Sequence, residues 1–181
     1  MRVKACRMRT ATLQRTMVLN LKHRSNDFAT LSAQETSALL ACARSLRESP
    51  TATSERALRG KNLCLLSATH DYPGAALLLQ AATGLGAHVA RVPPSLSASS
   101  SADAIQHTAR LLGRLYDGVA CVGIPSELVR RIAADADVPM FDGISAPDHL
   151  VARLAEQLGE DTPAHDNQRL MIQALLLCTL A

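Results

Sequence analysis

The sequence predicts an α/β domain with three layers, in which a four-stranded parallel sheet lies between helices. Two observations lead to this fold class. Short apolar runs alternate with amphipathic segments along the chain, which is the order of repeated strand–helix units. The apolar runs, such as NLCLLS at residues 62–67, are also continuous, as expected of strands buried on both faces. A chain of 181 residues with 48% apolar and 19% charged residues suits one such domain.

The elements follow in order. Ser32 and Glu35 form a capping box before a helix that runs to about Leu46. Pro73 suits the first position of a helix, and we expect Asp71 to be its N-cap. The strands are expected at 62–67, 88–92, 118–122 and 138–141, and the remaining helices at 73–83, 102–116, 126–136, 147–158 and 167–180. The alternation implies right-handed crossovers between parallel strands.

The loop between the first strand and its helix is the natural place for a ligand. In such a unit the helix N-terminus offers free N–H groups to an anion. No Lys or Arg lies between Lys61 and Arg91, however. The sequence therefore predicts the shape of an anion site without the positive charge that a phosphate dianion needs. His70, Asp71 and Tyr72 are an alternative polar site in the same loop, although we favour a capping role for Asp71.

Several collinear segments resemble the ornithine and aspartate carbamoyltransferases. They are LRGKNLCLL at 58–66, AATGLGAHV at 81–89, HTARLLGR at 107–114, and the segment 126–145. Residues 167–176 resemble the last helix of that family, which returns from the second domain to the first. The resemblance implies an N-terminal, carbamoyl-phosphate-binding domain at 17–181 that includes the closing helix 167–180, behind a basic extension at 1–16. It also implies that the second domain, which binds ornithine or aspartate, is absent.

The charged groups of that family are missing at the matching positions. Its Ser-Thr-Arg-Thr-Arg loop, which holds carbamoyl phosphate, falls on DYPGA at 71–75, and an Arg after the third strand falls on Gly123. Its His-Pro-Cys-Gln segment falls on residues 149–152, where only His149 remains. We interpret His149 as a structural residue in the first turn of its helix, or as a relic that still polarises a carbonyl. The resemblance implies a degenerate substrate site with no catalytic residue, whose candidates are Thr69, His70, Asp71, Tyr72, Gly74 and His149.

Charge is distributed unevenly along the chain. Residues 1–25 carry seven basic side chains and no acid, whereas the rest carries 12 basic and 16 acidic residues. Such an N-terminus is typical of a transit peptide, a nucleic-acid arm or an unstructured extension ahead of Met17, and we favour the extension. Aromatic residues make up 2% of the chain, which argues against a base-stacking platform. For this reason we expect no nucleic-acid partner. No apolar run reaches the ~18 residues of a membrane span, so we expect no membrane partner either.

The five cysteines are scattered, odd in number and never spaced as C-x-x-C. This pattern predicts reduced thiols and a cytoplasmic protein. Cys64 and Cys121 lie inside strand patterns and should be buried small hydrophobic residues. His88 and His107 have no second ligand at a useful spacing, so we assign no metal and no cofactor.

Two hypotheses on function remain, with a third ranked below them. The first is a non-catalytic carbamoyltransferase homologue that acts as an oligomeric binding or assembly module, either as a trimer of itself or with a full-length carbamoyltransferase. The second is a half-site that binds carbamoyl phosphate or another small anion through backbone N–H groups, while a partner chain supplies the second domain. The third, a nucleic-acid binder, rests only on the charge of residues 1–25. The missing arginines favour the first.

Overall fold

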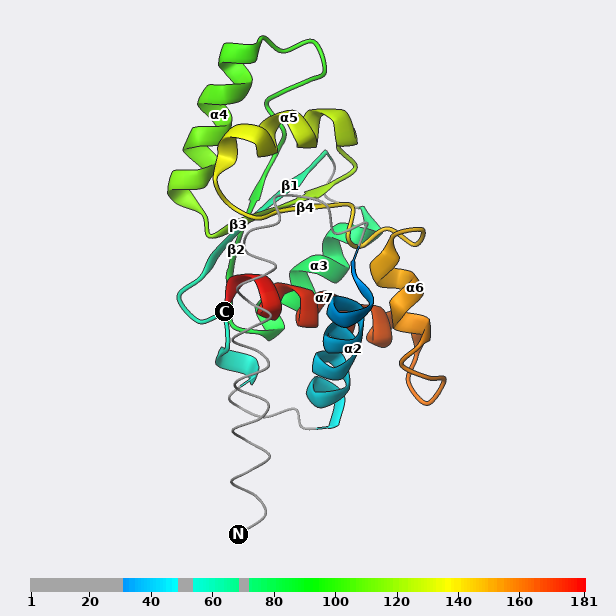
Figure 1. The fold of residues 1–181 in the computed structure, drawn as a ribbon. Helices are drawn as coiled ribbons and strands as arrows, with labels where there is room; N and C mark the ends of the chain where they lie inside the picture. The colour runs from blue at the N-terminus through cyan, green and yellow to red at the C-terminus, as the bar shows by residue number, and fades with distance from the viewer. Residues whose placement is uncertain (1–30, 49–53, 69–71) are drawn as a thin grey trace.

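The computed structural model describes residues 31–48, 54–68 and 72–181. Its sheet has the order β2-β1-β3-β4, and every strand pair is parallel. The strands are β1 (Asn62–Ser67), β2 (His88–Val92), β3 (Gly118–Val122) and β4 (Met140–Asp142). Helices α4 (Ala102–Leu115) and α5 (Ser126–Ala136) cover one face of the sheet (Figure 1). The other face carries α2 (Ala33–Glu48), α3 (Pro73–Gly84), α6 (Leu150–Glu156) and α7 (Ala164–Leu180), and a short 3₁₀ turn, Ser54–Arg56, precedes β1. The predicted fold class is confirmed.

The central strand β1 explains why the apolar runs are continuous. Leu63 and Leu65 point into the core shared with α3 and α7, whereas Cys64 and Leu66 point into the core under α4 and α5. All four side chains are buried. A strand covered on both faces has no exposed side on which to place polar residues. The predicted bounds of β1, β2, β3 and α5 agree with those of the structure.

Helix α7 belongs to the core on its side of the sheet. It contacts α2, α3 and α6. The Gln173 side chain, which is 6% exposed, donates a hydrogen bond of 3.2 Å from Nε2 to the Ala81 carbonyl oxygen of α3. The large apolar side chains that α7 buries are those of Leu170, Met171, Ile172, Leu175, Leu176 and Leu180. The last helix therefore packs on this domain, as its apolar sequence requires.

Two helix N-caps were predicted, and one is confirmed. Glu35 Oε2 accepts hydrogen bonds from Ser32 N at 2.8 Å and from Ser32 Oγ at 2.6 Å, and Glu35 N donates to Ser32 Oγ at 3.3 Å. This is the expected capping box. The assignment of Asp71 as N-cap of α3 was wrong, because the N-cap is Tyr72, directly before Pro73, and it makes no side-chain capping bond. Asp71 itself lies outside the described residues.

Three elements begin at residues other than those predicted. Strand β4 begins at Met140 rather than at residue 138, since Pro139 has no N–H to give to a ladder. Helix α6 begins at Leu150, because residues before it form turns in which Ala146 N donates to Gly143 O at 2.8 Å and His149 N to Ala146 O at 3.2 Å. Helix α7 begins at Ala164, three residues before the expected start. Within the described ranges, no helix has both the length and the apolar character needed to cross a membrane.

Candidate functional site

The candidate site lies where the carboxyl ends of β1, β3 and β4 meet. Strand β1 has β2 on one side and β3 on the other, and the two crossovers run on opposite faces of the sheet. Such a topological switch point is where open α/β sheets bind their ligands. Tyr72 and Gly74 follow β1, Gly123 follows β3, and Ser145 and His149 follow β4. The structure thus brings Tyr72, Gly74 and His149, three of the predicted site residues, to one edge.

The first turn of α3 packs closely against the loop after β4. A Cβ atom added to Gly74 would lie 2.5 Å from Ser145 Oγ and 3.2 Å from Ser145 Cβ. Ser145 is buried, and its carbonyl oxygen accepts a hydrogen bond of 3.2 Å from Gln168 Nε2 of α7. Glycine is therefore required at position 74 by this close approach. The same contact places a side chain of the protein itself beside the backbone that was predicted to hold an anion.

The Tyr72 ring lies against Gly123. A Cβ atom added to Gly123 would lie 3.1 Å from Tyr72 Cε2, and Gly123 has a φ of +70°, a conformation that favours glycine. The Tyr72 side chain is 48% exposed, so the ring forms the outer wall of the site at this point. Position 123 matches an arginine in the carbamoyltransferase pattern described above. Here an aromatic ring packs on the backbone at that position.

His149 is the N-cap of α6 rather than a residue of its first turn. Its Nδ1 atom accepts a hydrogen bond of 3.1 Å from the N–H of Val151. A neutral imidazole that accepts at Nδ1 carries its proton on Nε2. Burial lowers the pKa of His149, with the charge of Arg153 acting in the same direction and Asp142 and Asp148 opposing it. The capping bond supports the structural interpretation and leaves one N–H of the ring for another acceptor.

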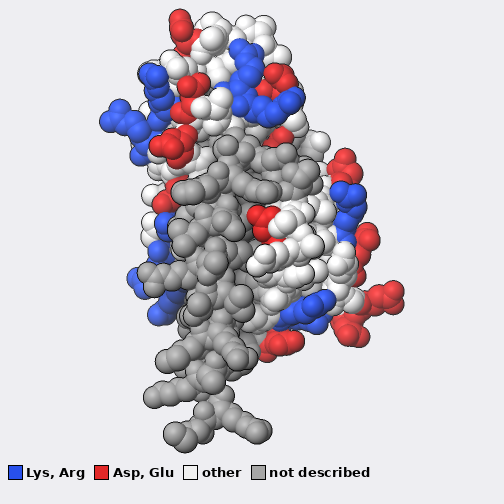
Figure 2. Space-filling model, viewed as in Figure 1, with Lys and Arg blue, Asp and Glu red and all other residues white. Residues whose placement is uncertain are grey.

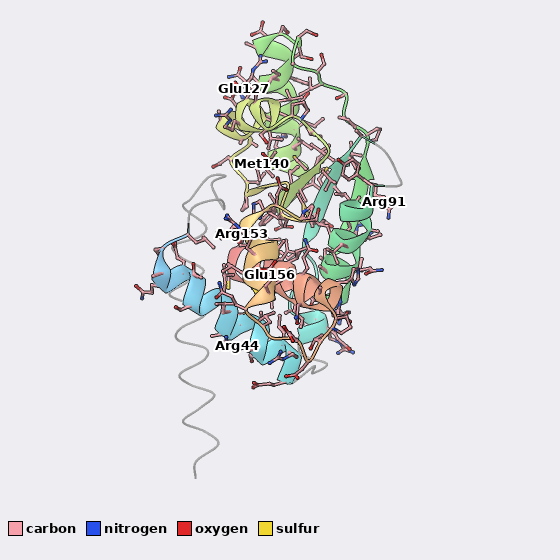
Figure 3. All side chains as sticks on the ribbon, turned by 90° about the vertical axis from the view of Figure 1, so that its right-hand side faces the viewer. Arg44, Arg91, Glu127, Met140, Arg153 and Glu156 are labelled. Atoms are coloured by element: carbon pink, nitrogen blue, oxygen red, sulfur yellow. The ribbon has the colours of Figure 1, made fainter. Side chains whose placement is uncertain are left out.

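Among the described residues, Lys and Arg side chains do not cluster at this edge. Arg153 on α6 and Arg91 at the end of β2 lie on opposite sides of the molecule in Figure 3. Two carboxylates, Asp142 and Asp148, act on His149 together with the single guanidinium of Arg153. On the face shown in Figure 2, the Lys and Arg side chains alternate with Asp and Glu and form no broad basic patch. The described part of the site is thus more acidic than a phosphate site would be.

Sequence analysis missed Arg91 as a site candidate, treating it only as the end of a cation-free stretch. The parallel register pairs Arg91 with Leu65, which brings it to the carboxyl edge beside Ser67. There it lines a cavity of about 120 Å³ at the carboxyl ends of β1 and β2, together with Ser67 and Ala75. The signal was available, because parallel strands end at the same edge and Arg91 is the fourth residue of its strand.

The other predicted features are the remaining loop residues, the strand cysteines and the metal assignment. Thr69, His70 and Asp71 lie outside the described residues, so their place in the substrate site remains a prediction. Cys64 and Cys121 are buried in β1 and β3, as predicted. Among the residues that the structure describes, no three His, Cys, Asp or Glu side chains are grouped as metal ligands would be.

The position of His149 predicts a pH dependence of stability. Because its pKa is lowered from 6.5 in the folded state, the unfolded chain binds a proton more readily. The contribution of His149 should be complete above pH 6.5 and should fall as the pH drops through the lowered folded pKa. We expect His149→Asn, which keeps a capping acceptor but does not titrate, to flatten this decline, whereas His149→Ala costs roughly 1 kcal/mol above pH 6.5 and less as the pH falls. Urea unfolding across the acid range measures both, and equal slopes for wild type and His149→Asn would contradict the assignment.

Known proteins similar to this chain are ornithine carbamoyltransferases. No family model matches the chain. The ornithine carbamoyltransferase of Cutibacterium acnes is 33% identical over 144 residues, which are 78% of this chain and 43% of that protein. The structure of the enzyme from Thermus thermophilus matches with a TM-score of 0.59 at 26% identity, covering 73% of this chain and 45% of that one. The ornithine transcarbamoylase of Giardia lamblia matches in fold with a TM-score of 0.60 at 20% identity, over 76% of this chain and 42% of that one.

These matches agree with one another in extent. The chain spans less than half the length of the relatives it matches, and the shared part is consistent with the N-terminal domain of the family. The resemblance noted in the sequence is thereby confirmed. In both sequence and fold, this chain is related to the ornithine carbamoyltransferases over about 43% of their length.

Proposed function

We propose that this chain is a non-catalytic, carbamoyltransferase-like module that self-associates. The observation that carries the proposal is the charge at the switch point, where two carboxylates, Asp142 and Asp148, and a single guanidinium, Arg153, act on His149. Carbamoyl transfer requires the site to hold carbamoyl phosphate as a dianion and to polarise the carbonyl of that substrate with preorganised donors. A site with carboxylates in this place disfavours the dianion before any transfer begins.

The packing of the site supports the same proposal. Tyr72 lies on Gly123, and Ser145 lies against Gly74, so protein side chains contact the backbone at two positions where a ligand would be expected. The Nε2–H group of His149 is one remaining donor for a carbonyl oxygen. A single neutral hydrogen bond contributes only about 0.5–1.5 kcal/mol, which does not replace several arginines.

The exposed face of α4 supports the assembly role. Leu111 and Leu115, one helical turn apart, are 48% and 55% exposed. They line an apolar cavity of about 190 Å³ together with Leu96, Leu112 and Ile124. Large exposed apolar side chains grouped beside a cavity are typical of a protein contact. We propose that this contact is made by a second copy of the chain, because the resemblance to the carbamoyltransferases implies a trimer formed through this domain.

A second function is favoured by one observation, the cavity at the carboxyl ends of β1 and β2. Arg91 and Ser67 line it, so a small anion is a suitable ligand for this half-site. In this alternative, a partner chain supplies the groups that bind the second substrate. This alternative predicts anion binding that depends on Arg91.

Sedimentation at micromolar concentration tests the assembly. We expect the full chain to form an oligomer, most simply a trimer, and deletion of residues 1–16 to leave its size unchanged. Replacing Leu111 and Leu115 together by Lys should give monomers, because charged side chains would then face the partner. Arg110→Ala, a change at an exposed position of the same helix, is the matched control. A monomeric wild type would refute self-association and leave a mixed complex with a full-length relative as the assembly role.

A further inference from the structure

Two cysteines that lie far apart in the sequence form a pair in the fold. Cys42 lies on α2 and Cys178 lies on α7, and their side chains are hydrogen-bonded to each other. Helices α2 and α7 pack together (Figure 1). Cys42 contacts the apolar cluster to which Cys178 belongs. The two sulfur atoms are therefore neighbours across a helix–helix interface within one chain.

The two thiols differ in access and in acidity. Cys178 is 3% exposed, whereas Cys42 is only half-buried, so a reagent in solution reaches Cys42 first. The hydrogen bond from Cys178 lowers the pKa of Cys42, although burial opposes this effect. The same bond and burial raise the pKa of Cys178, which therefore keeps its proton. Cys42 is the thiol suited to attack, and Cys178 is the thiol placed to resolve the product.

The remaining described cysteines provide an internal contrast. Burial raises the pKa of Cys64 to about 12 and that of Cys121 further still. They lie on adjacent strands, but Cys64 is paired with Val119 and Cys121 with Leu66, so the two residues are not opposite each other. Buried thiols with raised pKa values react slowly with disulfides. Of the described cysteines, only the pair on α2 and α7 combines contact with access.

We propose that Cys42 and Cys178 are a redox modification site that closes to an intramolecular disulfide on meeting a small-molecule disulfide such as oxidised glutathione. The Cys42 thiolate attacks one sulfur of the oxidant, and a glutathione thiolate leaves. Cys178 then loses its proton to that thiolate and attacks Sγ of Cys42, which releases the second glutathione thiolate, protonated by solvent. The two cysteines are oxidised to one disulfide, and the oxidant's disulfide is reduced to two thiols.

The cross-link would fasten the closing helix to the rest of the domain. It joins α2, near the start of the described chain, to the last turn of α7, and so encloses nearly the whole domain in one covalent loop. A disulfide that closes a long loop restricts the unfolded chain strongly. The oxidised protein should therefore unfold at higher urea concentration than the reduced protein. The inference concerns α2 and α7 and does not depend on the proposed function.

The experiment uses the full chain, reduced under anaerobic conditions and then equilibrated in buffers of increasing oxidised-to-reduced glutathione ratio. Trypsin cleaves after Arg24, Arg44 and Arg169, so the expected cross-link joins peptide 25–44 to peptide 170–181. We expect this linked peptide to accumulate in mass spectra of the native protein, and N-ethylmaleimide to label Cys42 ahead of Cys64 and Cys121. Reduction should reverse both the cross-link and the shift in the urea midpoint.

The variants separate the pair from the other thiols. Cys42→Ser and Cys178→Ser should each abolish the linked peptide, and Cys178→Ala is the substitute if the buried serine prevents folding. Cys6→Ser, which removes the cysteine outside the described residues, should leave the cross-link unchanged. The proposal is overturned if the folded wild type gives no 42–178 peptide at any glutathione ratio. It is equally overturned if the peptide forms no faster in the native protein than in the urea-unfolded chain.

Discussion

A chain that ends at residue 163, before α7, should not fold. The deletion removes six large buried apolar side chains, those of Leu170, Met171, Ile172, Leu175, Leu176 and Leu180. Their burial contributes roughly 9–18 kcal/mol at the usual value for such side chains. A whole domain is typically stable by only about 5–15 kcal/mol. We expect insoluble protein, or a state that keeps far-ultraviolet circular dichroism, loses the near-ultraviolet signal and binds a hydrophobic dye.

Point variants on the same helix give a matched control. Leu175, which is 1% exposed, and Leu177, which is half-buried, are the same residue type two positions apart. Leu175→Ala should lower the free energy of unfolding by about 2–5 kcal/mol, and Leu177→Ala by clearly less. Urea denaturation of the full chain measures both. A truncated protein that unfolds cooperatively and stays soluble would show that α7 is not part of this core.

The sheet could be predicted because the apolar sequence of its strands directly reflects their burial on both faces. The runs at 62–67 and 118–122 are apolar without interruption, and the structure buries them between two helix layers. The capping box of α2 could also be predicted, since its two partners lie three residues apart. The start of α6 could not, because the turns from Gly143 to His149 depend on packing against α3 and α7, which the local sequence does not encode.

The candidate site was predictable in outline and less so in detail. The loop after β1 and His149 were identified from the sequence. The structure places Tyr72, Gly74 and His149 at one edge of the sheet. The contacts between Tyr72 and Gly123 and between Gly74 and Ser145 join segments that are far apart in the chain. No local pattern marks such pairs. Arg91 was missed for a related reason, since its position depends on the register between strands.

Carbamoyl phosphate should bind this chain at least a thousandfold more weakly than it binds a complete ornithine carbamoyltransferase. Three arginines of the family pattern, two in the loop matched by residues 71–75 and one at position 123, are replaced here by uncharged or acidic residues. Each charge-assisted hydrogen bond contributes about 1.5–3 kcal/mol. Losing three of them corresponds to a weakening of roughly 10³–10⁶-fold. Titration calorimetry should show no saturable heat below about 1 mM, where the binding free energy is only about −4 kcal/mol.

The same titration separates the two proposed functions. The Cutibacterium acnes enzyme is the positive control for heat and for citrulline formation, and this chain should form no citrulline with ornithine. A dissociation constant in the low micromolar range would contradict the non-catalytic module and favour the half-site. In that case Arg91→Ala should abolish binding if the cavity beside Ser67 holds the anion, while Arg59→Ala, at an exposed position before β1, should not.

Binding that survives Arg91→Ala would point instead to the backbone N–H groups at the start of α3, where the close contact between Gly74 and Ser145 would have to open. Ser145→Gly should then tighten binding, because it removes the side chain that lies against that turn.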